Sequence, residues 1–142
     1  MLIYKRKGET MDRQYEGSER RRFERTKVNF TVIYNVNSPL LIRLMVGNKE
    51  IYTIAIDISE DGMAIFSNYE LPGSTIVTVN FVILDEKAVK AEDRRISIEV
   101  RGKVTSCVST KGKGYRLGIQ FINIIPADRC FLADFVRKAK QL

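Results

Sequence analysis

The stretch from Ile54 to Phe66 reads IAIDISEDGMAIF and has the pattern of a β-hairpin. Apolar and polar residues alternate on both sides of a single polar turn, as they do in two antiparallel strands that each bury one face. Because side chains in a strand point alternately to its two faces, the pattern predicts that Ile54, Ile56 and Ile58 share one face. The hairpin is therefore expected to form part of an apolar core.

Polar residues of the same stretch form an Asp-x-Ser-x-x-Gly pattern. Asp57 and Ser59 are predicted to lie together on the face opposite the isoleucines, which places a carboxylate beside a hydroxyl. Gly62 follows the turn, where we expect a positive φ that a residue with a Cβ would tolerate poorly. These residue types are common in ordinary turns, so the pattern alone indicates no more than a well-formed hairpin.

A basic segment upstream supplies a possible partner for this turn. Residues 19–25 read ERRRFER, in which Arg21 and Arg25 stand four positions apart. Positions i and i+4 lie on one side of the chain in both extended and helical segments, so both guanidinium groups can point at one target. The two segments together therefore predict a site in which arginines meet a carboxylate and a hydroxyl.

The order Arg-x-x-x-Arg and then Asp-x-Ser-x-x-Gly resembles the signature of the PilZ domain, a bacterial receptor for cyclic di-GMP. The strand pattern of residues 115–122, with Gly118 and Phe121, is similar to a late strand of that family, and the resemblance runs from about Arg20 to Leu142. It implies a cyclic di-GMP site and no other cofactor. The implied ligand-binding residues are Arg20, Arg21, Arg25, Asp57, Ser59 and Gly62.

Two readings of the arginine segment stay open. Arg22 could replace Arg21 as a ligand after a slip of one residue. In PilZ-like receptors, a basic residue just before the first motif arginine accompanies binding of a stacked ligand dimer, so Arg20 favours two ligands per chain over one. The resemblance also implies that the arginine segment closes over the ligand.

Arginine suits such a ligand chemically. Its planar fork binds guanine O6 and N7, pairs with phosphate and stacks on a ring, whereas lysine offers only a point charge. Asp57 can accept from the guanine N1–H and N2–H groups or hold an arginine in position, and Ser59 can bind phosphate or base. Gly62 would allow the backbone to approach a flat ring closely.

The remaining pattern predicts a single all-β domain with a C-terminal α-helix. We expect strands over 28–36, 40–46, 51–59, 75–84, 95–108 and 115–122, an exposed loop over 85–94, and a helix over about 126–142. Such regular strands favour a closed or nearly closed antiparallel barrel, and the resemblance implies a six- to seven-stranded antiparallel Greek-key β-barrel. The expected domain covers residues 20–142, after a flexible N-terminal arm over residues 1–19, and Met11 is an alternative start.

Composition excludes several classes of protein. The chain has no histidine, only two cysteines, and no apolar run long enough to span a membrane, which argues against zinc, a disulfide framework and membrane insertion. We expect a cytoplasmic protein. Net charge is +7, and residues 5–27 hold nine Lys or Arg against five Asp or Glu, so an anionic partner is expected.

Three functions fit these observations to different degrees. The first is a receptor that binds cyclic di-GMP, rearranges its N-terminal arm and signals to a protein partner controlling motility, exopolysaccharide or virulence. The second is a PilZ-like adaptor that binds proteins but no nucleotide, against which the intact arginines argue. A barrel binding single-stranded nucleic acid needs aromatic residues among exposed basic ones, which are largely missing, so neither DNA nor RNA is expected. No acid/base pair or nucleophile arrangement indicates an enzyme.

Overall fold

The computed structural model describes residues 23–84, 89–90 and 95–140. The predicted arm over residues 1–19 and most of the predicted loop over residues 85–94 lie outside this part. The described elements, in chain order, are β1 (Thr26–Lys27), β2 (Thr31–Ser38), α1 (Leu40–Met45), β3 (Ile51–Ile58), β4 (Gly62–Ser67), β5 (Ile76–Leu84), β6 (Arg95–Ser109), β7 (Tyr115–Phe121) and α2 (Pro126–Lys140).

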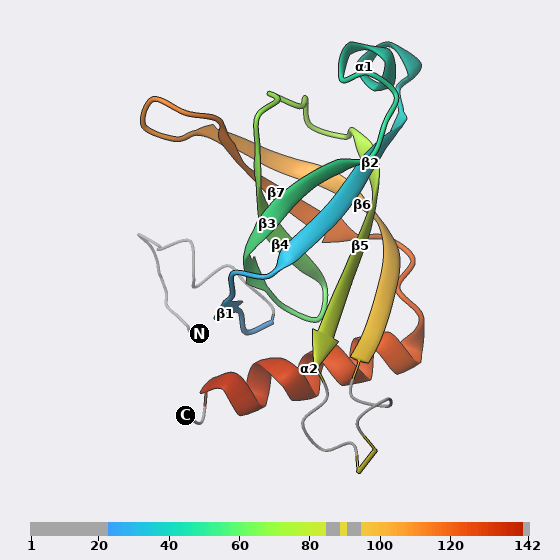
Figure 1. The fold of residues 1–142 in the computed structure, drawn as a ribbon, viewed down its shortest axis with the longest axis vertical. Coiled ribbons are helices and arrows are strands. Elements are labelled where there is room, and N and C mark those ends of the chain that lie inside the picture. The colour runs from blue at the N-terminus through green and yellow to red at the C-terminus, as the bar shows by residue number, and fades with distance from the viewer. Residues whose placement is uncertain (1–22, 85–88, 91–94, 141–142) are drawn as a thin grey trace, which may run out of the picture.

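Strands β2 to β7 close into an antiparallel barrel (Figure 1). Their order is β3-β2-β5-β6-β7-β4, and the additional pairing of β3 with β4 completes the ring. The short β1 extends the edge of β3 beyond β2. Strand β4 lies beside β7 rather than beside β5, which is the crossover of a Greek key. The predicted fold class, an antiparallel β-barrel followed by a C-terminal helix, is confirmed.

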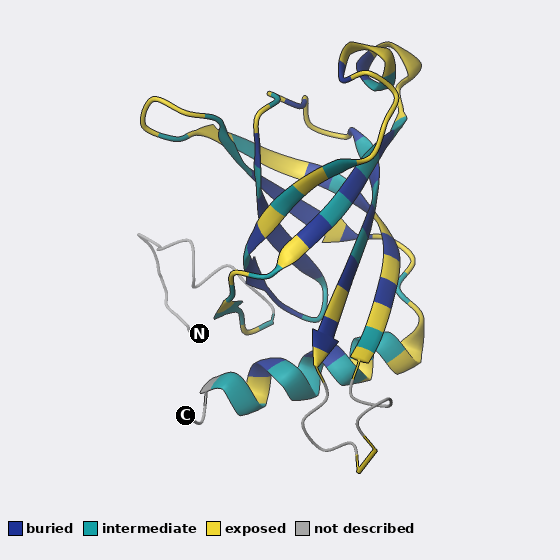
Figure 2. Cartoon of the chain, viewed as in Figure 1, coloured by how far each residue is buried: buried dark blue, intermediate teal, exposed yellow. Residues whose placement is uncertain are grey.

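The core fills the barrel and is covered at one end by α2. Alternate residues of each strand point inward and form one continuous apolar cluster, as the mixed burial colours along the strands show (Figure 2). Leu132 and Val136 of α2 belong to this cluster, and Phe131 and Phe135 pack against it. Helix α2 therefore buries its apolar stripe against the barrel, as its 3.6-residue period predicts.

The predicted strand over residues 40–46 is wrong, because this segment forms helix α1. A short apolar run does not distinguish helix from strand by periodicity, and Leu, Arg and Met all favour helix. The helix begins after Pro39, which is extended, and the chain turns at Gly47, which has a φ of 93°. Proline before a helix and glycine after it are the ordinary boundaries of a helix.

The predicted common face of Ile54, Ile56 and Ile58 is also wrong. Ala55 pairs with Ile65 of β4, whereas Asp57 pairs with Ala64, so Ile56 is an extra residue that forms a β-bulge. Ala55 and Ile58 consequently both face the core, and Ile54 is exposed. A one-residue shift reverses the faces of a strand, which simple alternation does not reveal.

Strands β5 and β6 depart from the pattern in a similar way. We predicted that residues 75–84 are buried on both sides, but Val82 and Leu84 are exposed, because the outer face of β5 meets solvent. In β6 the register shifts between Val104 and Ser106, so Val108 points outward instead of joining the predicted inner face. The bulge thus lies at Thr105, three residues beyond Gly102.

Gly62 is required for packing rather than for an unusual backbone angle. Its φ is not positive, contrary to our expectation. A Cβ at this position would lie 2.4 Å from the carbonyl oxygen of Ile119, because β4 and β7 approach each other closely here. Real Cβ atoms do not come so near to a backbone oxygen, so only glycine fits without movement of a strand.

A polar network lies at the opposite end of β4. The Tyr34 hydroxyl and Ser67 Oγ share a hydrogen bond of 2.8 Å, and both residues are almost completely buried. Ser67 Oγ also accepts from the Tyr69 amide at 2.9 Å and donates to the Tyr69 carbonyl oxygen at 3.0 Å. Burial raises the pKa of the Tyr34 phenol above its ordinary value, since the phenolate would lose its hydration.

We expect Gly62→Ala to lower the free energy of unfolding by about 2 kcal/mol, in the range of overpacking in a rigid core. Denaturant unfolding would measure the change. Gly73→Ala is the matched control, because nothing lies within 4 Å of a Cβ at that position and its φ is not positive. Equal effects of the two substitutions would contradict the assigned close approach.

Tyr34→Phe is expected to lower stability by about 1 kcal/mol through loss of one buried hydrogen bond. Above pH about 10 the unfolded chain releases the Tyr34 proton while the folded chain retains it, so wild-type stability falls as pH rises. Tyr34→Phe removes the pH dependence that Tyr34 contributes, so the unfolding free energy of the variant should fall less steeply than that of the wild type between pH 9 and about 11. Tyr52→Phe, at an exposed position, should leave the slope unchanged. Identical slopes for wild type and Tyr34→Phe would refute the linkage.

Candidate ligand-binding site

The turn between β3 and β4 is closed by hydrogen bonds of Ser59. Its amide donates to the Gly62 carbonyl oxygen at 2.9 Å, and its hydroxyl donates to Asp61 Oδ1 at 2.7 Å. The Asp61 amide in turn approaches Ser59 Oγ at 3.3 Å. Ser59 has no exposed surface. Its hydroxyl therefore shapes the turn, an arrangement that serine commonly makes with nearby backbone groups.

Asp57 lies on the outer face of the barrel, next to this turn. Its neighbour Ile58 points into the core, and Asp57 pairs with Ala64, which lies between two core residues of β4. Because Ile56 forms a β-bulge, the Asp57 side chain points to this outer face. Bulges near functional sites often redirect a side chain in this way. Both carboxylate oxygens are occupied: Oδ1 accepts from Arg25 Nη1 at 3.2 Å and Oδ2 accepts from Arg116 Nη2 at 2.6 Å.

Strand β1 brings Arg25 to this carboxylate. Thr26 pairs with Ile58 and Lys27 pairs with Asp57, so the residue before β1 lies level with the start of the turn. The Val28 amide continues the register by donating to the Ile56 carbonyl oxygen at 3.0 Å. The second arginine of the basic segment and the aspartate of the turn pattern, separated by 32 residues in sequence, are therefore in direct contact.

Arg116 was not predicted as a site residue. It is in β7, where Leu117 and Ile119 face the core and Arg116 and Gly118 face outward. Gly118 pairs with Ala64, which pairs with Asp57, so only small residues separate the carboxylate from β7. The only sequence signal was an arginine on the outward face of a strand, and this signal is too common to identify a site.

The three charges have unequal access to solvent. The Asp57 side chain is 11% exposed, whereas those of Arg25 and Arg116 are 25% and 37% exposed. Each guanidinium group has five N–H donors and directs one of them at Asp57. The trio carries one net positive charge, with its donors accessible and its carboxylate shielded. Such an arrangement can bind an anion or the acceptor edge of a base.

Helix α2 reaches the same region through Arg129. Its Nη1 lies 3.4 Å from Glu60 Oε1 in the turn, and its guanidinium carbon lies 5.9 Å from the ring centroid of Phe23. A cavity of about 250 Å³ is lined by Phe23, Glu24, Glu60, Ala133 and Val136. The chain just before Arg25 therefore lies between the turn and α2, and the site is bordered by three separate segments.

The structure brings only some of the predicted site residues together. Arg25 and Asp57 are in contact, and Ser59 and Gly62 form the turn beside them. Arg20 and Arg21, together with the alternative Arg22, lie outside the described residues. Across the described part of the chain, no group of three or more His, Cys, Asp or Glu side chains is arranged to hold a metal ion.

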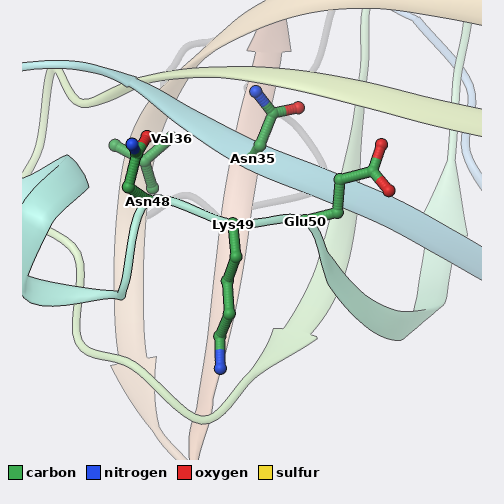
Figure 3. A pocket seen from close by; sticks show the side chains of 5 residues that line it. All are labelled: Asn35, Val36, Asn48, Lys49 and Glu50. Atoms are coloured by element: carbon green, nitrogen blue, oxygen red, sulfur yellow. The ribbon is translucent and has the colours of Figure 1, made fainter.

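A second pocket is found at the other end of the barrel. It has a volume of about 190 Å³ and is lined by Asn35, Val36, Asn48, Lys49 and Glu50 (Figure 3). Neither arginine nor an aromatic ring lines it, so it offers no fork for guanine and no surface for stacking. The cluster around Asp57 remains the better candidate for binding a purine nucleotide.

Comparison with known proteins places this arrangement in context. The chain resembles the Bacillus subtilis inhibitor of motility MotI/DgrA at 17% identity, with a TM-score of 0.64, covering 86% of this chain and 52% of that one. It resembles the K. pneumonia MrkH–c-di-GMP complex at 16% identity and a TM-score of 0.57, covering 86% and 55%. It resembles the PilZ domain of Escherichia coli YcgR with c-di-GMP at 14% identity and a TM-score of 0.52, covering 86% of this chain and 92% of that one.

These similarities show the fold, and the chain spans about half the length of MotI and MrkH. No curated protein matches the sequence. The family model of the PilZ domain, however, matches residues 19–138, which include the arginine segment, the whole barrel and most of α2. On this match, the chain belongs to the PilZ domain family.

Proposed function

We propose that this chain is a receptor for cyclic di-GMP and binds it beside Asp57. The observation that supports this most directly is the contact of Arg25 with Asp57 at 3.2 Å, which joins the two sequence patterns in space. The c-di-GMP complexes of MrkH and of the YcgR PilZ domain show that proteins of this fold can bind the ligand. Arg20 and Arg21 are proposed to complete the site from the segment before Arg25.

The proposed ligand requires donors for two phosphates and for guanine edges. Arg25 and Arg116 have donors that the Asp57 carboxylate does not occupy, and both side chains are partly exposed. An arginine fork can bond O6 and N7 of one guanine or clamp a phosphate, and its flat face can stack on the ring. Two such forks, held at fixed positions, would recognise the ligand with little loss of side-chain entropy.

Asp57 is proposed to act mainly by holding these two arginines. Its oxygens accept hydrogen bonds from Arg25 at 3.2 Å and from Arg116 at 2.6 Å, which leaves little of the carboxylate for guanine N–H groups. Of the two roles considered from sequence, positioning of arginine is therefore the one we favour. Ser59 and Gly62 are proposed to contribute by fixing the turn that carries Asp57, rather than by touching the ligand.

Signalling would follow from the position of the segment before Arg25. Phe23 lies against Arg129 of α2, and Arg129 also contacts Glu60 of the turn. A ligand that engages Arg20 and Arg21 would bring this segment toward the turn and change the surface shared with α2. We propose that a protein partner reads this change, which makes the chain a non-enzymatic effector. Arg20 favours a stacked pair of ligands over a single one.

Calorimetric titration with cyclic di-GMP tests the site directly. We expect Arg25→Ala to weaken binding at least thirtyfold and Arg116→Ala about tenfold, because each removes one fork from the ligand or from Asp57. Arg21→Ala should also remove most of the affinity. Arg101→Ala, at an exposed position on β6, is the matched control and should bind like the wild type. Thermal unfolding of every variant would separate loss of binding from loss of fold.

Two results would overturn this assignment. Tight binding that survives both Arg21→Ala and Arg25→Ala would show that the ligand binds elsewhere. A folded wild-type chain that takes up no cyclic di-GMP would favour the adaptor that binds proteins alone. The same titration gives the stoichiometry, and two ligands per chain are expected.

Limited trypsin digestion tests the proposed rearrangement. Saturating cyclic di-GMP should slow cleavage after Arg20, Arg21 and Arg22 by at least fivefold, because bound guanidinium groups are withheld from the protease. Cleavage after Lys49, in the exposed loop between α1 and β3, serves as the internal control and should keep its rate. Equal rates with and without ligand at the arginine segment would disprove the closure, even if titration shows binding.

A further inference from the structure

Helix α1 presents an apolar face to solvent at one tip of the molecule. Its first, second, fifth and sixth residues lie on one side of the helix and are all highly exposed: Leu40 56%, Leu41 70%, Leu44 57% and Met45 63%. Only Ile42 is buried beneath it. Figure 1 shows α1 projecting beyond the strands, at the end of the barrel opposite α2. Large apolar side chains gathered on a projection indicate a contact surface.

Unpaired cations lie at the same end of the barrel as this apolar face. Antiparallel pairing places the end of β2, the start of β3 and the β6–β7 hairpin at the same end of the barrel. Arg43 of α1 and the loop residues Lys49, Lys111 and Lys113 lie at this end, against Glu50 and Glu70. None of these six side chains forms an ion pair with another described residue.

Five other described cations do have ion-pair partners. Arg25 and Arg116 pair with Asp57, Arg129 with Glu60, and Arg137 and Lys138 with Asp134. Each of these five cations therefore has a carboxylate partner within the protein, although the cations outnumber the three carboxylates by two charges. The unpaired cations at the α1 end can therefore pair with negative charge on a binding partner. The same partner must also offer an apolar region for the exposed leucine and methionine side chains of α1.

We propose that the α1 end docks on the surface of an anionic lipid bilayer. Leu40, Leu41, Leu44 and Met45 would enter the boundary between headgroups and acyl chains, while the flanking cations contact lipid phosphates. This docking is peripheral. Among the described helices, none has the length and apolar composition that a membrane span requires. The proposal does not depend on nucleotide binding, since no residue of the Asp57 cluster belongs to the apolar face of α1 or to the four cations named above.

The shape of this end favours a bilayer over a protein groove. Helix α1 has six residues, fewer than two turns, so it cannot supply the i, i+3, i+4 and i+7 anchors of a helix bound in a groove. Figure 1 shows α1 and the β6–β7 hairpin projecting toward the same end but on opposite sides of the barrel. A flat anionic surface can contact α1 and the β6–β7 hairpin at the same time. A protein groove that binds only α1 would not reach the lysines of the hairpin.

A second copy of this chain is a poorer occupant. Pairing two α1 faces would bring two sets of unpaired cations together without adding any new carboxylate beyond Glu50 and Glu70. Like charges brought close together oppose association. An anionic bilayer has the opposite sign and adds a favourable contact for each lysine or arginine within about 10 Å, the screening length at 0.1 M salt.

Vesicle co-sedimentation of the full chain tests the proposal. We expect binding to vesicles of phosphatidylcholine with 30% phosphatidylglycerol, and at least tenfold weaker binding to phosphatidylcholine alone. Leu41→Ser with Leu44→Ser should lower the partition coefficient about tenfold or more. Leu84→Ser with Ile125→Ser is the matched control, because these residues are 62% and 58% exposed at the other end of the barrel, and it should bind like the wild type.

The hairpin lysines test the planar footprint. Lys111→Gln with Lys113→Gln should weaken binding to the anionic vesicles several-fold, while Arg95→Gln with Arg101→Gln, on the same strand pair but nearer α2, should not. The proposal is overturned if the wild type does not sediment with anionic vesicles or if the α1 and control variants bind equally. It is also overturned if light scattering shows a lipid-free dimer that Leu41→Ser with Leu44→Ser converts to a monomer, which would assign the face to a second copy.

Discussion

The carboxylate of Asp57, with one guanidinium group on each oxygen, is the interaction on which the site depends. Shielding a carboxylate from water is costly, and two hydrogen-bonded cations offset that cost better than one. The pair of arginines reaches Asp57 only because the barrel closes: β1 extends along β3 on one side, and β4 and β7 follow on the other. The site is therefore a product of the strand order as much as of the motif residues.

The Asp-x-Ser-x-x-Gly pattern combines two kinds of requirement. Ser59 and Gly62 are needed to build the turn, one through its hydroxyl and the other through the close approach of the Ile119 carbonyl oxygen. Asp57 alone directs its side chain at the arginines. Substitution of Ser59 or Gly62 would disturb the turn itself. Substitution of the arginines would change the charge of the site and leave the turn in place. This difference makes the arginines the informative positions for studying function.

Sequence alone predicted the barrel, the C-terminal helix and the meeting of Arg25 with Asp57, because periods of 2 and 3.6 and the family resemblance are local signals. It failed where a feature is too short or depends on register. The six residues of α1 are as apolar as a strand, and the bulges at Ile56 and Thr105 reverse the alternation without changing composition. Arg116 is identified only by the pairing of β7 with β4, which no local pattern of residues encodes.

The two ends of the barrel carry different electrostatics, and this separation constrains how they can communicate. Around Asp57 and Glu60, arginines pair with carboxylates in a cluster bordered by the segment before Arg25. Near α1, cations are unpaired beside an apolar face. A closed barrel with one continuous core lies between them, and its dense packing resists deformation. If both ends bind as proposed, their free energies should add, so that the bilayer sets where the receptor is held and the nucleotide sets which state it adopts.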